Sequence, residues 1–144
     1  MSKLLGGIQT ALLAAFTLVV LLDRSPHVAF GGPLAIVLGD VIALSGVALI
    51  LVAIRTMGKA VQVEAAPREG AGLVTRGVYA KLRHPIYTGI ALTMVGFVLR
   101  GISAAGLVVG AAALGFLAAK ARYEETLLAR RYPEYEAYRK TTLF

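Results

Sequence analysis

The sequence predicts an all-α integral membrane protein with about four transmembrane helices. Of its 144 residues, 58% are hydrophobic, and the mean hydropathy is +0.75. Soluble domains are about 45–50% apolar, so this composition is typical of a protein that lies in lipid. The apolar residues form four long runs, and most of the charged residues lie between or after them. Since lipid offers the backbone no hydrogen-bond partner, such runs fold as helices.

The first run covers residues 4–22 and contains no charged residue. At 1.5 Å per residue a helix of this length spans about 28 Å, close to the thickness of the hydrocarbon core. The segment 23–26 that follows, Asp-Arg-Ser-Pro, is a poor signal-peptide cleavage site. We therefore expect a helix that stays in the protein rather than a signal sequence.

The second run covers residues 34–54 and follows Pro33, a residue favoured in the first turn of a helix. It contains Asp40, whose carboxylate is costly to place in lipid. We expect Asp40 to lie near the interface or to face other helices, in a structural hydrogen bond.

The third and fourth helices are expected at 85–99 and 102–128, with only Arg100 and Gly101 between them. So short a connection predicts a tight antiparallel helical hairpin. The glycines of the fourth helix favour close helix contact in lipid, and its last part is expected to continue out of the membrane as a C-terminal extension. These glycines are Gly106, Gly110 and Gly115.

The distribution of Lys and Arg predicts the orientation. With four spans, the N-terminal tail, the polar stretch 55–83 and the C-terminal tail share one side, which holds 13 of the 15 cations. The positive-inside rule places this side in the cytoplasm. We expect one integral membrane domain over residues 1–144, multi-pass, with both termini cytoplasmic, in the inner (plasma) membrane of a prokaryote.

The composition also limits the kinds of partner and ligand that we expect the protein to bind. The net charge of +7 is explained by anionic lipids beside the juxtamembrane cations, so no nucleic-acid partner is expected. The chain has no cysteine, which excludes disulfides and thiolate ligands. With only two histidines, we expect no metal site.

The loop 57–84 and the start of the next helix hold the most concentrated chemistry. Arg83 and His84 precede Pro85, whose helix offers unpaired N–H groups that favour an anion. Tyr79 and Tyr87 add flat surfaces with a polar tip. One interpretation is a pocket for a polar or anionic ligand. The alternative is an ordinary interfacial loop with Arg and Tyr anchors.

Four groups of residues resemble, in their order along the chain, the motifs of a known family. The set is similar to the isoprenylcysteine carboxyl methyltransferase and phospholipid methyltransferase superfamily of membrane enzymes, over about residues 57–138. The groups are Leu73–Tyr79 (Leu-Val-Thr-Arg-Gly-Val-Tyr), Arg83–Gly89 (Arg-His-Pro-Ile-Tyr-Thr-Gly), Glu124-Glu125 with Leu128, and Glu134-Tyr135 with Tyr138.

This resemblance implies a methyltransferase that uses S-adenosylmethionine and has no separate soluble Rossmann-type domain. It places the cofactor at the cytoplasmic membrane face, between the loop and the ends of the last helices. The implied cofactor contacts are Ala71, Gly72, Leu73, Val74, Tyr79, His84, Pro85, Ile86, Tyr87 and Glu124.

The chemistry of these residues agrees with that assignment. A carboxylate such as Glu124 suits the ribose hydroxyls and the ammonium of the cofactor, and the helix start at His84 suits its carboxylate. Lys120 and Arg122 are the candidates for orienting the substrate. The isoprenylcysteine enzymes have arginine where this chain has Lys120, which keeps the charge but lacks the bidentate fork.

Methyl transfer from a sulfonium requires alignment and exclusion of water more than acid–base help, so no general base is named. The acceptor is expected to be lipophilic or small, with a carboxylate, an amine or a thiol as its nucleophile. The sequence does not choose among these acceptors, nor does it give the oligomeric state. The alternative function is a non-catalytic membrane relative used for ligand sensing or assembly.

Overall fold

The computed structural model describes residues 2–23, 27–28, 32–58 and 72–144, and it confirms the helical architecture. Two short strands, which the sequence does not predict, pair antiparallel in the register His27 with Ser103 and Val28 with Ile102. The elements in chain order are α1 (Ser2–Leu22), β1 (His27–Val28), α2 (Pro33–Met57), the 3₁₀ helix η2 (Gly77–Ala80), α3 (Pro85–Arg100), β2 (Ile102–Ser103), α4 (Ala104–Arg131) and α5 (Tyr135–Thr141).

The helices have the length and surface of membrane-spanning elements. Among the described residues, α1, α2 and α4 are long and apolar enough to cross a membrane, and α3 is apolar but has only 16 residues. Large apolar side chains cover the outside of α2, where Leu34 and Leu44 are 72% and 68% exposed. A surface of this kind is stable in lipid and costly in water.

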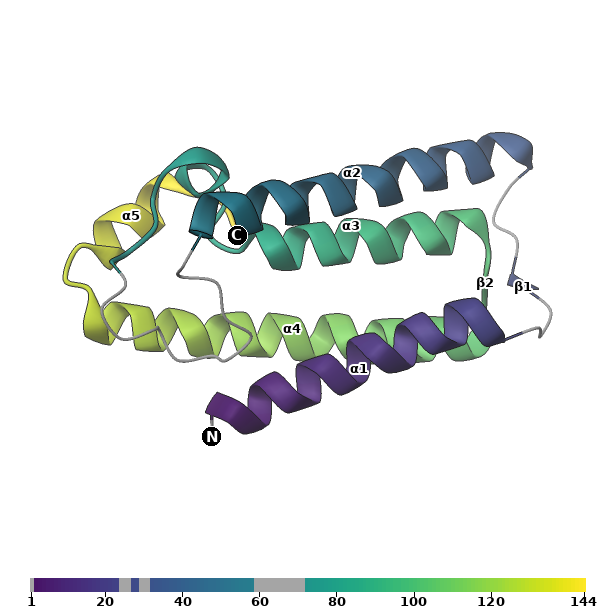
Figure 1. Cartoon of the computed structure of the whole chain (residues 1–144), viewed down its shortest axis with the longest axis horizontal. Helices are drawn as coiled ribbons and strands as arrows, with labels where there is room; N and C mark the ends of the chain where they lie inside the picture. Colours follow the sequence, from purple (N-terminus) through teal and green to yellow (C-terminus); the bar gives the residue numbers. More distant parts are fainter. Residues whose placement is uncertain (1, 24–26, 29–31, 59–71) are drawn as a thin grey trace.

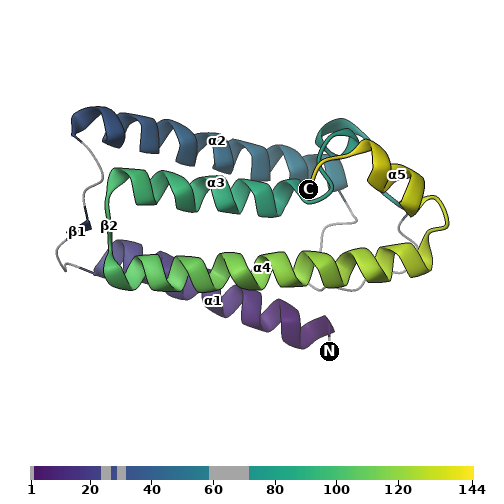
Figure 2. The same ribbon diagram turned by 180° about the vertical axis from the view of Figure 1, so that it is seen from behind.

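The long helices form two layers, as Figures 1 and 2 show: α2 lies beside α3, and α1 crosses α4. The predicted tight hairpin of α3 and α4 is therefore wrong in its packing. The connection between them is short, but α3 packs closely against α2 and only loosely against α4.

Paired glycines explain why α2 and α3 are the close pair. A Cβ atom added to Gly46 would lie 2.5 Å from the carbonyl oxygen of Gly89, and one added to Gly96 would lie 2.5 Å from that of Gly39. The two backbones touch at both levels, seven residues apart on each helix. Without side chains in between, the helices reach a separation that only small residues permit.

Aromatic and aliphatic side chains join the two layers. Phe16 of α1 meets Phe97 of α3 edge to face, with ring centroids 6.2 Å apart, and it also covers Gly110 of α4. Met94, Ile102 and Ala113 complete the buried cluster beside Phe16. Of the other glycines in α4, Gly106 faces Ile102, whereas a Cβ added to Gly115 would meet no atom within 4 Å.

The two ends of the molecule differ in chemistry. At one end β1 and β2 tie the helix connections together, and Arg100 forms an ion pair there with Asp40. Asp40 is 44% exposed, so this carboxylate is a structural partner at the edge of the bundle, as expected. At the other end lie η2, the start of α3, the end of α4 and α5, which together form the candidate site (Figure 1).

We predict that Gly46→Ala destabilises the protein by about 1–3 kcal/mol, because the new methyl group overlaps the backbone of Gly89. Thermal unfolding of detergent-purified protein measures this effect. Gly115→Ala is the matched control and should unfold at the wild-type temperature or slightly above it, since its methyl group enters open space and alanine favours helix. Equal unfolding temperatures for the two variants would contradict the packing described.

Candidate functional site

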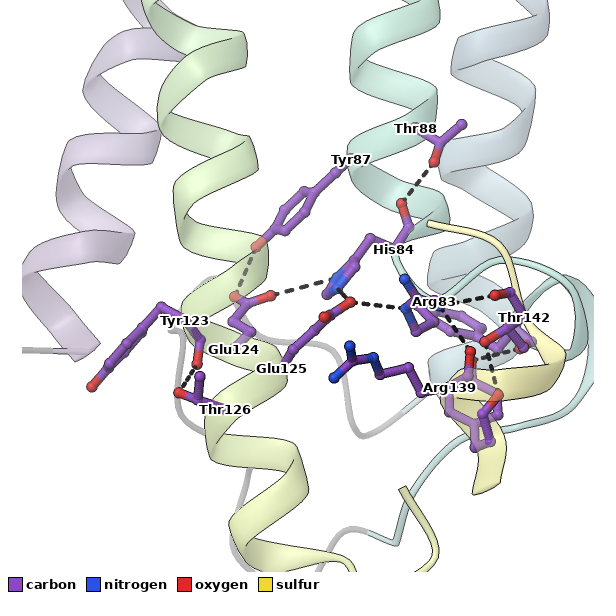
Figure 3. A network of polar contacts seen from close by, with 12 residues as sticks. Arg83, His84, Tyr87, Thr88, Tyr123, Glu124, Glu125, Thr126, Arg139 and Thr142 are labelled. Atoms are coloured by element: carbon purple, nitrogen blue, oxygen red, sulfur yellow. Dashed lines mark hydrogen bonds and ion pairs between the residues drawn. The ribbon is translucent and has the colours of Figure 1, made fainter. Parts of the chain in front are cut away.

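The site lies between two helix ends, and Figure 3 shows its side chains reaching toward one another. His84 and Tyr87 come from the start of α3, and Glu124 and Glu125 come from the last third of α4. The segment after α5 closes the cluster from the side. We call the set Gln9, Arg83, His84, Tyr87, Lys120, Glu124 and Glu125 the polar cluster.

The start of α3 fixes two aromatic rings. Pro85 is fully buried and opens the helix, and His84 is its N-cap residue, with a carbonyl that accepts hydrogen bonds from the N–H and hydroxyl of Thr88. The ring of His84 stacks on that of Tyr87, with centroids 5.5 Å apart and planes 8° apart. The side chain of His84 does not cap the helix and is free to face α4.

Three side chains lie close to the carboxylate of Glu124. The hydroxyl of Tyr87 donates to its Oε1 at 2.8 Å, and the ammonium of Lys120 lies 3.4 Å from the same oxygen. Lys120 and Glu124 are four residues apart on α4, the spacing predicted to put them on one face. The other oxygen, Oε2, lies 3.8 Å from Nδ1 of His84, which is beyond hydrogen-bond distance. One carboxylate oxygen is thus engaged and the other is lightly held.

Glu125 joins α4 to the loop before α3. Its Oε1 accepts a hydrogen bond from Nε of Arg83 at 2.8 Å and lies 3.3 Å from Nε2 of His84. The guanidinium of Arg83 also donates to the carbonyl oxygens of Arg139 and Thr142, at 3.1 and 2.8 Å. Arg83 therefore uses its planar set of donors to connect a carboxylate to the C-terminal segment.

The C-terminal segment covers this part of the cluster. The N–H of Arg83 donates to Leu143, the N–H of Leu143 donates to Lys81, and the ring of Phe144 lies 5.4 Å from that of His84. From α5, Tyr138 donates to the carbonyl oxygen of Tyr79 at 2.6 Å. These contacts hold η2 against α5.

One buried donor is unused. Tyr135 of α5 is 1% exposed, and its hydroxyl has no hydrogen-bond partner among the residues that the structure describes. Such a group costs free energy unless a ligand or water satisfies it. Electrostatic interactions of Tyr135 with Glu125 and Arg83 place it beside the cluster.

Burial sets the charge of the site. It lowers the pKa of His84 below the ordinary histidine value; the carboxylate of Glu125 opposes this shift and the guanidinium of Arg83 adds to it. His84 is therefore neutral at neutral pH. Burial also raises the pKa of Tyr79, so this phenol stays protonated.

An apolar cavity of about 290 Å³ lies between α1, α2 and α3, and the cluster residues do not line it. Leu13 lines it one turn after Gln9 on α1, and Ile90 lines it three residues after Tyr87 on α3. Residues that line the cavity and residues of the polar cluster thus lie on the same face of α1 and on the same face of α3. Only Thr17 and Thr93 add hydroxyl groups to its wall.

The structure brings together four of the predicted site residues: His84, Tyr87, Lys120 and Glu124. Arg122 is exposed, two residues from Lys120 and so on another side of α4, and it does not join them. Of the rest, Tyr79 and Pro85 are buried, Leu73, Val74 and Ile86 are half-buried, Gly72 is exposed and faces open space, and Ala71 lies outside the described residues.

Two contributors to the site are absent from the residues expected from the sequence: Gln9 and the segment after α5. Gln9 accepts a hydrogen bond from Lys120. It was detectable as an amide within an otherwise apolar run, a position where polar groups are costly. Nothing in the sequence pattern indicates that residues 142–144 lie beside His84.

We predict that wild-type stability falls as the pH decreases from about 6.5, where an unfolded histidine titrates, because the folded protein takes up this proton only at lower pH. His84→Gln lacks this proton linkage and should lose less stability between pH 7 and 5. Thermal unfolding across this range measures the difference. Identical pH dependence in both proteins would show that His84 is not buried in its neutral form.

Comparison with known proteins gives the family. A model of the phospholipid methyltransferase family matches residues 34–135, which is more than half of the chain. No curated protein and no solved structure matches. The family match confirms the resemblance carried by the loop and α4 motifs. The chain belongs to the phospholipid methyltransferase family, a family of membrane methyltransferases.

Proposed function

We propose that this protein is an S-adenosylmethionine-dependent methyltransferase that acts within the membrane on a lipophilic acceptor. The observation that carries the proposal is the largely buried carboxylate of Glu124, held by Tyr87 and Lys120, with an apolar cavity whose wall begins one turn from Tyr87. Membership in a methyltransferase family supports the reaction type. The cluster supplies polar partners for a cofactor, and the cavity supplies space for an acceptor.

The residues present fit the proposed cofactor. It carries an ammonium, a carboxylate, ribose hydroxyls and an adenine, and its polar groups have counterparts here. Oε2 of Glu124 is available as an acceptor, the hydroxyl of Tyr135 is an unused buried donor, and the first turn of α3 has no side-chain cap. The residues proposed to hold the cofactor are Ala71, Gly72, Leu73, Val74, Tyr79, His84, Pro85, Ile86, Tyr87 and Glu124.

The cofactor, when bound, supplies a methyl group already activated on a sulfonium. The protein then has to hold the reactants in line and keep water out, which the buried rings of His84 and Tyr79 favour. Neutral His84 serves as a contact surface rather than a proton carrier. The side chains of the cluster are used in holding one another, so we assign no general base among them.

The acceptor enters from the lipid. The cavity is bounded by α1, α2 and α3 and lined almost wholly by apolar side chains, which suits a hydrocarbon chain rather than a water-soluble substrate. Ile90 of its wall lies one turn after Tyr87 on α3, so a lipid tail held among the helices keeps its headgroup near the cluster. The nucleophile on that headgroup can be a carboxylate, an amine or a thiol.

We place this site at the cytoplasmic face, with both termini on the same side. The positive-inside rule supports this placement, because the described cations on either side of η2, in the loop before α3, in α4 and in α5 gather at the site end of the bundle, away from Arg100. S-adenosylmethionine is made in the cytoplasm, so this orientation gives direct access to the cofactor.

We predict that Glu124→Gln weakens binding of S-adenosylhomocysteine by about tenfold or more, because a charged hydrogen-bond acceptor is lost from a buried site. Calorimetric titration of detergent-purified protein measures the dissociation constant. Glu134→Gln makes the same chemical change at an exposed position and serves as the matched control.

A Glu124→Gln protein that binds S-adenosylhomocysteine as tightly as the control would remove Glu124 from the cofactor site. A wild-type protein that gives no heat at millimolar ligand would contradict the proposed function itself. That result would favour the alternative function, a non-catalytic relative used for sensing or assembly.

A further inference from the structure

Gln9 is a buried amide in a helix that is otherwise apolar at this level. It is 8% exposed, and its side-chain oxygen accepts a hydrogen bond from the ammonium of Lys120 on α4. A polar side chain in lipid is costly unless it finds a partner. Gln9 therefore pairs with one specific group rather than with solvent.

Lys120 is enclosed on all sides. Its side chain is 1% exposed, and its ammonium lies 3.4 Å from Oε1 of Glu124 and 5.6 Å from the centre of the Tyr87 ring. Gln9 approaches from α1, whereas Glu124 belongs to α4 and Tyr87 to α3. Three helices thus contribute to the position of the cation, and α1 supplies it with a neutral acceptor.

The contribution of α1 lies outside the family match, which begins at residue 34. We propose that Gln9 is a positioning residue: it holds the ammonium of Lys120 on the Oε1 side of Glu124 and so leaves Oε2 available to a ligand. This inference rests on the proposed function, in which Glu124 contacts the cofactor. It adds α1 to the site as the element that orients Lys120, the cation one turn before Glu124 on the same helix face.

An amide suits this role better than a carboxylate or an apolar group. Lys120 and Glu124 balance each other in charge, so a neutral acceptor adds no net charge to a buried cluster. Leucine would fill a similar volume but remove the acceptor, and the ammonium would then lose one of the contacts that hold it on the Oε1 side. Ligand and lysine would compete for one oxygen.

The first test needs no ligand. Lys120 is labelled with an amine-acetylating reagent in detergent-purified protein, and its modification is measured by mass spectrometry. We expect Gln9→Leu to raise the labelling rate of Lys120 about fivefold, the order of effect of one lost hydrogen bond. Gln9→Glu keeps an acceptor oxygen at the same reach and should preserve protection. Thr10→Val, an exposed polar-to-apolar change on the same helix, is the control and should match wild type.

The second test is a double-mutant cycle on S-adenosylhomocysteine binding. Gln9→Leu should raise the dissociation constant about fivefold in the wild-type background and leave it unchanged in the Lys120→Met background, because Gln9 acts through Lys120. A purely structural hydrogen bond between α1 and α4 would lower the unfolding temperature without changing this dissociation constant.

The outcomes separate the two proposals. Unchanged labelling of Lys120 in Gln9→Leu, or an equal loss of affinity in both backgrounds, overturns the positioning role. Increased labelling in a protein whose wild type binds no S-adenosylhomocysteine supports the Gln9–Lys120 contact and overturns the cofactor assignment.

Discussion

The carboxylate of Glu124 must be held inside a membrane protein, and the site is organised around that requirement. Burying a carboxylate is costly unless cations and donors surround it. Here α4 supplies Lys120 at the next turn, α3 supplies the hydroxyl of Tyr87, and α1 supplies Gln9 to hold the lysine. Three helices are thereby fixed at one point. The same contacts leave one carboxylate oxygen lightly held, as a ligand site requires.

The packing of the bundle keeps the helices that form the site in place. Backbone contact at the glycine pairs locks α3 to α2, so the start of α3 has a fixed position. The looser contact between α3 and α4 leaves room at the site end for the side chains of the cluster. It also permits the apolar cavity beside α1. Close packing on one side of α3 thus fixes the position of this helix, and looser packing on the other side leaves space for the candidate site.

Much of the fold and part of the site could be predicted from the sequence. Helices follow from apolar runs because lipid allows the backbone no alternative. The pairing of Lys120 with Glu124 follows from their spacing. The family motif indicated that His84 and Tyr87 belong to the same site. The choice of α2 as the partner of α3 could not be predicted, since glycine contacts depend on the relative rotation of two helices. Gln9 was missed for a related reason: its partner is 111 positions away.

The proposed function is transfer of a methyl group to a lipid-soluble acceptor at this cluster and cavity. The most direct measurement incubates the purified protein with methyl-labelled S-adenosylmethionine and a membrane lipid extract, and identifies the labelled product by mass spectrometry. We expect the wild-type protein to form a labelled lipid-soluble product and Glu124→Gln to form much less of this product. Label that appears only in water-soluble products, or equally with both proteins, would contradict the proposed function.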